Sequence, residues 1–335
     1  MKVVIGTMIL KQHDKLLEVL QLEALDNRLE IFHPKKELVQ HAFKIKKTEV
    51  RGEKEVDYPL HFLDDQHYII LHNLRLTDES GYFQIDTLIL TKNFILILEV
   101  KNWYGTLLFS EDGQVIRIGD DQKEEGFPDP VVQARIQQYR LQKWLRKCDI
   151  PIVPIDFFVV ISFPSTIIKP LNPNNKIPKE VIHNNHLFFR IQDLDQIYTQ
   201  SILKKTVLMN LAKNLIDSHT PPKADILKKY SISKSDLIKG VICPKCSSTR
   251  MVREKRKWLC KTCNYTSVTA HAGALNEYKL LVGDMISNRE TREFLQVNSP
   301  DVARRLLKME KFQSVGNTKG KLYKLHFSNY QVNAE

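Results

Sequence analysis

Two carboxylates and a lysine occur within neighbouring apolar segments of the chain. Asp86 lies inside the run 83–90, and Glu99 and Lys101 end the run that begins at Phe94. A carboxylate is costly to bury unless it is paired or bound to a metal ion. If the two runs form a hairpin, Asp86 can approach Glu99, and strand alternation places Glu99 and Lys101 on one face.

Two acids and an ammonium group on one sheet face suit the hydrolysis of a phosphodiester bond. Carboxylate oxygens are ligands for Mg²⁺ or Mn²⁺, which polarise a phosphoryl group and lower the pKa of a bound water. Lys101 could orient that water or stabilise developing negative charge. The alternative is a buried Lys–carboxylate ion pair at the end of a strand.

The segment from about Glu49 to Phe163 resembles the NERD (nuclease-related) domain of the PD-(D/E)xK nuclease superfamily. The motifs that carry the resemblance are Arg51-Gly52-Glu53, Phe83-Gln84-Ile85-Asp86, Glu99-Val100-Lys101-Asn102-Trp103-Tyr104-Gly105 and Asp129-Pro130-Val131-Val132-Gln133. They occur in the expected order and cover about a third of the chain. The family usually has Asn at the position of Asp129.

The resemblance implies a restriction-endonuclease-like fold and assigns roles to five residues. Asp86, Glu99 and Glu53 would bind Mg²⁺ or Mn²⁺. Lys101 would be catalytic, and Gln133 would line the site from the following helix. On residue pattern alone, Glu53 also fits a solvated helix face and Gln133 an exposed polar position.

Four cysteines form two CxxC pairs separated by thirteen residues: Cys243, Cys246, Cys260 and Cys263. Four thiolates from two tight turns suit tetrahedral Zn²⁺, and the spacing resembles a zinc ribbon. The segment between the pairs carries Arg253, Arg256, Lys257 and Trp258, for which we expect contact with nucleic acid. The alternatives are a purely structural staple and, less favoured, a redox dithiol.

The C-terminal residues predict a helix, a turn and a second helix, followed by a basic hairpin. Ser299 is a candidate N-cap, and Pro300 suits the first helical position. This order is similar to a winged-helix module and implies nucleic-acid binding through five basic residues: Arg304, Arg305 and Lys308 on the recognition helix, with Lys319 and Lys321 on the wing. A small helical packing or dimerisation module is the alternative.

The distribution of charge points to a polyanionic partner. The 335 residues carry a formal net charge of +11. From residue 223 to the end there are 22 Lys and Arg against 10 Asp and Glu, whereas residues 1–222 hold 28 against 29. Basic side chains gain affinity for nucleic acid by displacing counterions from phosphates. A merely solvated basic surface is the alternative.

The composition places further limits on the class of protein. Hydrophobic residues make up 42% of the chain, which is enough for a core. No window of about 18 apolar residues predicts a membrane span, and no signal-peptide cleavage pattern follows the start. We therefore expect a cytoplasmic protein with no membrane partner, in which paired cysteines bind metal rather than form disulfides.

Hydrophobic periodicity predicts an α/β or α+β core, with a mixed sheet flanked by helices. The expected helices span 14–32, 49–63, 130–147 and 191–217; the expected strands span 68–74, 82–90, 94–100, 107–109, 115–118 and 157–162; and 164–179 is expected to be a loop. The predicted organisation is an N-terminal helical segment (1–47), the nuclease-like domain (48–165), a loop, helices and linker (166–238), the zinc ribbon (239–270) and the winged-helix-like module (271–330).

Together these features predict a metal-dependent nuclease whose basic, zinc-binding C-terminal region holds nucleic acid. We expect DNA as the substrate, and RNA is the alternative. Two other functions stay open: an inactive nuclease fold that binds or regulates DNA, and a zinc-ribbon regulator. Association with a second copy of the chain also stays open.

Overall fold

The computed structural model describes residues 8–13, 17–64, 66–111, 113–222, 225–247, 250–316 and 320–327. The chain divides into two compact units: Met1–Lys15 with Lys47–Pro222, and Leu16–Lys46 with Lys223–Glu335. The segments expected at 1–47 and 166–238 are each divided between the two units. No helix among the described residues combines the length and apolar character needed to cross a membrane.

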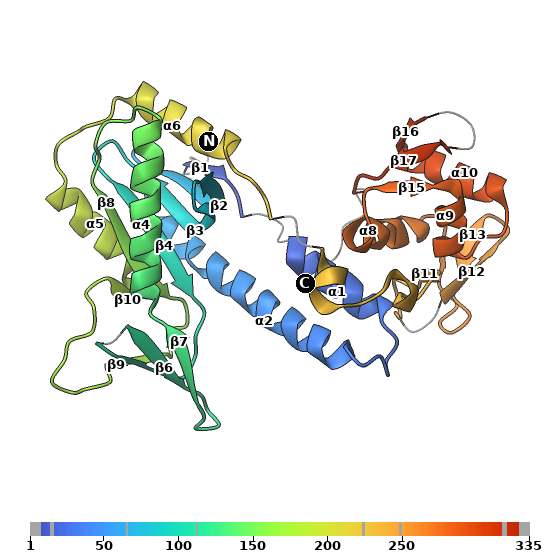
Figure 1. Cartoon of the computed structure of the whole chain (residues 1–335), viewed down its shortest axis with the longest axis horizontal. Helices are drawn as coiled ribbons and strands as arrows, with labels where there is room; N and C mark the ends of the chain where they lie inside the picture. The colour runs from blue at the N-terminus through green and yellow to red at the C-terminus, as the bar shows by residue number, and fades with distance from the viewer. Residues whose placement is uncertain are drawn as a thin grey trace, which may run out of the picture. The chain divides into compact units, whose positions relative to one another are not determined.

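A six-stranded mixed sheet forms the centre of the first unit (Figure 1). In sheet order its strands are β1 (Met8–Lys11), β2 (Ile69–Asp78), β3 (Gly81–Leu90), β4 (Ile95–Lys101), β8 (Ile155–Ile161) and β10 (Val181–His183). β2, β3 and β4 pair antiparallel, whereas β1 pairs parallel with β2, and β8 pairs parallel with both β4 and β10. The predicted mixed sheet is therefore confirmed.

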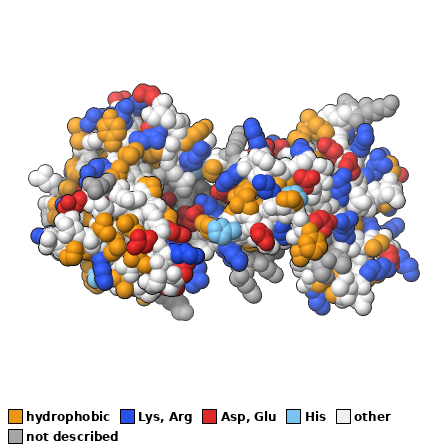
Figure 2. All heavy atoms as spheres, turned by 60° about the horizontal axis from the view of Figure 1, so that its bottom comes forward, with side chains coloured by type: hydrophobic (Ala, Val, Ile, Leu, Met, Phe, Trp, Pro, Cys, Tyr) orange, Lys and Arg blue, Asp and Glu red, His pale blue; other side chains and the backbone are white. Residues whose placement is uncertain are grey.

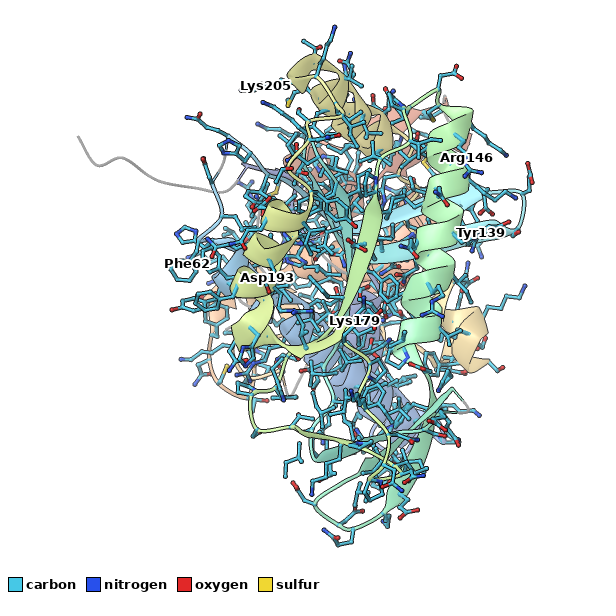
Figure 3. The ribbon with its side chains drawn as sticks, turned by 90° about the vertical axis from the view of Figure 1, so that its left-hand side faces the viewer. Phe62, Tyr139, Arg146, Lys179, Asp193 and Lys205 are labelled. Carbon is cyan, nitrogen blue, oxygen red and sulfur yellow. The ribbon has the colours of Figure 1, made fainter. Side chains whose placement is uncertain are left out.

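Helices bury both faces of this sheet. The helices of this unit are α3 (Asp57–Leu60), α4 (Pro130–Lys147), α5 (Leu187–Ile197) and α6 (Lys205–Asp217), together with the end of α2 (Lys36–Glu55) and a 3₁₀ turn at Asn184–His186. Ile95 and Ile97 share a core with α4 and α6, whereas Leu96 and Leu98 share one with α3 and α5. Figure 3 shows α4, which carries Tyr139 and Arg146, across the strands from α5, which carries Asp193. Burial on both faces explains why the strands are nearly continuous apolar runs.

Several elements differ from the sequence prediction: β1 and β10 were not predicted, and the helix expected at 191–217 is divided into α5 and α6. A second sheet, in the order β7 (Glu124–Pro128), β6 (Gln114–Ile118), β5 (Thr106–Phe109) and β9 (Ile167–Pro170), contains two strands that the sequence did not predict. β9 falls in the segment that was expected to be a loop. It pairs with β5 over only four residues and has no strong apolar alternation, so no strand pattern marks it in the sequence. The helix expected at 49–63 begins earlier, at Lys36, and is divided into α2 and α3 at Val56.

The second unit contains two small sheets among short helices. Its elements are α1 (Leu17–Arg28), the beginning of α2, α7 (Ile226–Tyr230), a 3₁₀ turn (Lys234–Asp236), β11 (Val241–Ile242), β12 (Arg250–Glu254), β13 (Lys257–Leu259), β14 (Thr266–Ser267), α8 (His271–Leu281), β15 (Met285–Ser287), α9 (Asn288–Leu295), α10 (Pro300–Met309), β16 (Gln313–Val315) and β17 (Leu322–Lys324). β11 to β14 form an antiparallel sheet, and β15, β17 and β16 form another in that order. Ser299 caps α10, as predicted, by accepting from Val302 N–H.

The cysteine-bearing sheet and the following helices share one hydrophobic core. Trp258 on β13 is 1% exposed, and its indole N–H donates to His271 Nδ1 on α8 at 3.3 Å. His271 Nε2 in turn lies 3.2 Å from a carboxylate oxygen of Glu310, just after α10. The modules predicted at 239–270 and 271–330 therefore pack together through a buried Trp–His–Glu contact.

Candidate functional site

The β3–β4 hairpin brings Asp86 to Glu99. The two strands pair antiparallel with Thr87 opposite Leu98, so the next position along places Asp86 beside Glu99. The backbone N–H of Val100 donates to Asp86 Oδ2 at 3.0 Å, which anchors the carboxylate across the hairpin.

Glu99 and Lys101 lie on the sheet face that α4 covers. Lys101 Nζ donates to Glu99 Oε1 at 2.6 Å and to Gln133 Oε1 of α4 at 3.0 Å. The second oxygen of Glu99 accepts from Gln137 Nε2 at 2.6 Å, and Glu99 is 2% exposed. Gln137 is a site residue that the sequence analysis missed. Its signal was its position one helical turn after Gln133, on the same helix face.

Glu53, near the end of α2, completes the acidic cluster. It lies close enough to Asp86 for its charge to raise the pKa of that carboxyl. Its Oε2 accepts from the side-chain amide of Asn73 at 2.7 Å. Asn73 is buried in β2 with φ of 49°, a left-handed conformation that Asn tolerates better than most residues. The sequence analysis missed Asn73, which has no motif to mark it.

Gly52 allows α2 to approach the strand end closely. A Cβ at this position would lie 2.4 Å from Cβ and Cγ of Asn102. Asn102 is itself fixed, because it donates to Thr48 O at 2.5 Å and accepts from Ser162 Oγ at 2.8 Å. The close contact sets the position of the helix one residue before Glu53.

Asp129 fixes the start of α4, which carries both glutamines. Its side chain accepts from Val131 N–H at 2.8 Å as the N-cap, and Pro130 occupies the first turn. Asp and Asn cap helices about equally well. The departure from the family's usual Asn is therefore conservative in structural terms.

The electrostatics of the cluster favour a bound cation. Burial raises the pKa of Asp86 well above its ordinary value, and the negative charges of Glu99 and Glu53 raise it further. The Val100 N–H and Lys101 oppose this shift without cancelling it. The carboxylates of Glu99 and Glu53 thus surround Asp86 with negative charge, which a cation would offset.

An aromatic groove of about 680 Å³ adjoins the site. It is lined by Asn102 and Ser162, which flank the end of β4, and by Arg51. The groove walls carry several aromatic rings, of which Tyr58 is 74% exposed and Phe62 is 54% exposed; the others are Phe163, Phe188 and Phe189.

The four cysteines converge as a tetrahedral zinc site requires. Sγ of Cys243 lies 3.7 Å from Sγ of Cys263, and Sγ of Cys246 lies 3.6 Å from Sγ of Cys260. Ligands at about 2.3 Å from a tetrahedral Zn²⁺ would be separated by about 3.8 Å. The backbone of Tyr265 lowers the pKa of Cys263, but burial and the other three thiols together raise it to about 12. A divalent cation would relieve this crowding of thiols.

The turns that carry Cys243 and Cys260 have the same backbone conformation. Ser247 N–H donates to Cys243 O at 2.9 Å, and Asn264 N–H donates to Cys260 O at 3.0 Å. Ser247 and Asn264 both have positive φ, of 51° and 55°. Each CxxC pair is thus presented by an equivalent tight turn.

Trp258 is a correction to the predicted nucleic-acid contacts. Its indole is buried against His271 and is covered by Arg253, whose guanidinium carbon lies 5.1 Å from the ring centroid. It has no free face for a base, so the prediction that it contacts nucleic acid is wrong. The buried ring instead packs the zinc-binding sheet against α8.

Three of the predicted basic residues line one groove of about 870 Å³ in the second unit: Arg253, Arg256 and Arg305. Burial lowers the pKa of Arg253, and the neighbouring charge of Arg305 lowers it further. Nη1 of Arg253 is buried without a hydrogen-bond partner. Repulsion between two arginines and an unsatisfied donor favour an anion in this groove.

The other predicted basic residues differ in their surroundings. Lys257 and Lys308 are exposed, and Arg304 pairs with Asp301 at 3.2 Å on the surface. Lys321 is half-buried over the Tyr323 ring, and Lys319 lies outside the described residues. Figure 2 shows Lys and Arg side chains on the visible face of this unit.

Comparisons with known proteins identify one family within the first unit. Residues 48–162 match the family described as "NERD: Nuclease-related domain". An uncharacterized protein of Bacillus anthracis is 27% identical over 180 residues, which are 53% of this chain and 80% of that protein. No solved structure matches the chain at a significant level.

Proposed function

Residues 48–162 form a nuclease-related domain, and on that premise we propose that the chain is a metal-dependent nuclease that hydrolyses phosphodiester bonds in DNA. The observation that carries this proposal is the cluster of Asp86, Glu99 and Glu53 beside Lys101. An inactive scaffold has no need for two further carboxylates that raise the pKa of the buried Asp86, because burying like charges together costs stability.

Each residue of the cluster has a part in hydrolysis. Asp86, Glu99 and Glu53 would hold Mg²⁺ or Mn²⁺, which when bound neutralises phosphate charge and makes water more acidic. Lys101, held by Glu99 and Gln133, would stabilise negative charge that develops on the phosphate. Gln137 satisfies the buried oxygen of Glu99 and so keeps the carboxylate oriented. The fold is proposed to be restriction-endonuclease-like.

The aromatic groove beside Asn102 would receive bases that flank the cleaved phosphate. Tyr58 and Phe62 expose ring faces, and stacking on such rings is largely independent of base identity. Arg51, which is 81% exposed, stands at the same groove and could contact a backbone phosphate. The arrangement favours unpaired bases near the site.

The second unit would hold nucleic acid through its basic groove. Zinc at the four cysteines would fold the β11–β14 sheet and so position Arg253 and Arg256 opposite Arg305 of α10. The order α8, β15, α9, α10, β16, β17 supports a winged-helix-like role, with α10 as the recognition helix. Its exposed face carries Arg305 and Lys308.

A cleavage assay with plasmid DNA, linear DNA and a matched RNA tests the proposal. We expect cleavage of DNA with Mg²⁺ or Mn²⁺, none in chelator, and loss of cleavage with Glu99→Gln. Glu124→Gln is the matched control, because Glu124 is an exposed glutamate of the small sheet. Cleavage of RNA alone would contradict the DNA assignment, and binding without cleavage under every metal would contradict the hydrolytic role.

A further inference from the structure

A second group of side chains with metal-ligating atoms is linked to Glu53 through Asn73. It consists of His13 just after β1, Asp57 at the start of α3 and His72 on β2. His13 Nε2 lies 2.8 Å from Asp57 Oδ1, and His72 Nε2 lies 3.7 Å from the same oxygen. The two imidazole rings stack with centroids 3.8 Å apart. Three segments distant in sequence thus place two ring nitrogens around one carboxylate oxygen.

The hydrogen bonds of Asn73 fix the tautomer of His13. Asn73 donates its amide N–H to Glu53, so its carbonyl oxygen is left to accept from His13 Nδ1 at 3.2 Å. With Nδ1 as the donor, a neutral His13 directs the lone pair of Nε2 at Asp57 Oδ1. Nε2 of a neutral His13 and Asp57 Oδ1 are then two acceptors 2.8 Å apart, which either a proton or a metal ion between them would hold together.

A hydrogen-bond contact at Nδ1 likewise orients the His72 ring. Its Nδ1 lies 3.0 Å from Thr87 Oγ1, while its Nε2 is buried without a hydrogen-bond partner. The His72 side chain is 1% exposed, and burial of this kind disfavours a protonated imidazole. A neutral imidazole whose other nitrogen is hydrogen-bonded is the form that binds metals.

We propose that His13 Nε2, His72 Nε2 and Asp57 Oδ1 bind a divalent transition-metal ion, separate from the ion of the acidic cluster. Ligand atoms at about 2.0–2.1 Å from a tetrahedral ion lie about 3.4 Å apart, and the 2.8 and 3.7 Å distances to Asp57 Oδ1 bracket that value. The two rings stack at 19°, so one imidazole must turn for both Nε2 lone pairs to point at one ion. Two imidazoles and a carboxylate suit Zn²⁺, Fe²⁺ or Co²⁺ rather than Mg²⁺. Lys11, which is 9% exposed, adds positive charge nearby, and Asp57 offsets it.

Metal at this site would join three segments of the first unit and act on the nuclease cluster through Asn73. Metal on Nε2 fixes the His13 ring, whose Nδ1 holds the Asn73 carbonyl, and Asn73 holds Glu53. The ion is therefore a positioning element for Glu53 rather than a participant in hydrolysis.

The test is a Co²⁺ titration of the zinc-loaded, full-length protein in excess Mg²⁺, which occupies the acidic cluster. We expect one further equivalent of Co²⁺, seen as visible d–d absorption without thiolate charge-transfer bands. His13→Gln and Asp57→Asn should lower this affinity by more than tenfold, and Thr87→Val should lower it by about 10–100-fold as a lost supporting hydrogen bond.

The exposed pair His67 and Asp64 provides the control, because His67 Nδ1 lies 2.7 Å from Asp64 Oδ2 on the surface of the same unit. His67→Gln should leave Co²⁺ binding unchanged. Unaltered circular dichroism and zinc content identify the variants that fold. Thiolate charge-transfer bands alone, or equal Co²⁺ affinity in wild type, His13→Gln and Asp57→Asn, would overturn the proposal.

Discussion

Replacing Gly52 with Ala should destabilise the first unit, against the ordinary preference of helices for alanine. Ala in a helix interior is favoured over Gly by about 1 kcal/mol. At this position, however, the new methyl group would lie 2.4 Å from Cβ of Asn102. Asn102 cannot rotate away freely, because Thr48 O and Ser162 Oγ both bond its amide. Helix α2 or the strand end must therefore move.

The expected size follows from these two opposing terms. Overpacking costs about 1–3 kcal/mol, and subtracting the gain in helix propensity leaves a net loss of up to about 2 kcal/mol. For a unit of this size, each kcal/mol lowers the melting temperature by about 2–4 °C. Displacement of α2 also moves Glu53, so cleavage should fall more than stability alone explains.

Gly273→Ala is the matched control for this substitution. Gly273 is also helical, in α8, and a Cβ there would meet no atom within 4 Å. This variant should be as stable as wild type or more stable by up to about 1 kcal/mol. Thermal unfolding followed by circular dichroism, together with the cleavage rate, measures both variants. Wild-type stability and wild-type cleavage in Gly52→Ala would refute the close-approach argument.

Three further predictions concern charge. Burial and the neighbouring carboxylates raise the pKa of Asp86, so on raising the pH the unfolded chain releases this proton before the folded chain does. Without metal, the first unit should therefore lose stability as the pH rises above about 4. Melting curves at several pH values should show this loss and its reversal by saturating Mg²⁺, and a stability of the metal-free protein that does not change with pH would contradict it. Arg28→Met should lower the free energy of unfolding by about 3–5 kcal/mol, since Arg28 is fully buried and its Nε donates to Glu277 at 2.6 Å. The double variant with Glu277→Met should recover most of this stability in unfolding experiments, and a double variant as unstable as the single one would exclude this explanation. Arg305→Ala should reduce the log–log salt slope of DNA binding by about 1, whereas Arg304→Ala, whose partner is Asp301, should reduce it less; equal slopes in wild type and Arg305→Ala would remove the basic groove from the interface.

The parts of the site that lie on regular elements could be predicted from the sequence. Asp86, Glu99 and Lys101 lie on two strands of a tight hairpin, so alternation and pairing determine their proximity. The helix 130–147 was predicted with its observed bounds, because Asp129 and Pro130 mark its start. The paired cysteines likewise predicted a cluster whose geometry follows from two short turns.

The parts that depend on tertiary packing could not be predicted. Asn73 acts through a left-handed kink inside a strand, and His13 reaches the sheet from a segment far away in sequence. Neither has a local pattern, because the partners are 20 to 60 residues away. Trp258 was misjudged for a related reason. A tryptophan in a basic hairpin resembles a base-stacking residue until the neighbouring module is known to cover it.

The most direct test of the account compares wild type and Lys101→Met in single-turnover cleavage of DNA at saturating Mn²⁺, with Mn²⁺ binding measured on the same samples. The account predicts that Lys101→Met still binds Mn²⁺ through Asp86, Glu99 and Glu53 but cleaves at least about 10²-fold more slowly. Cleavage by Lys101→Met at the wild-type rate would contradict the assignment of Lys101 and, with it, the proposed catalytic centre.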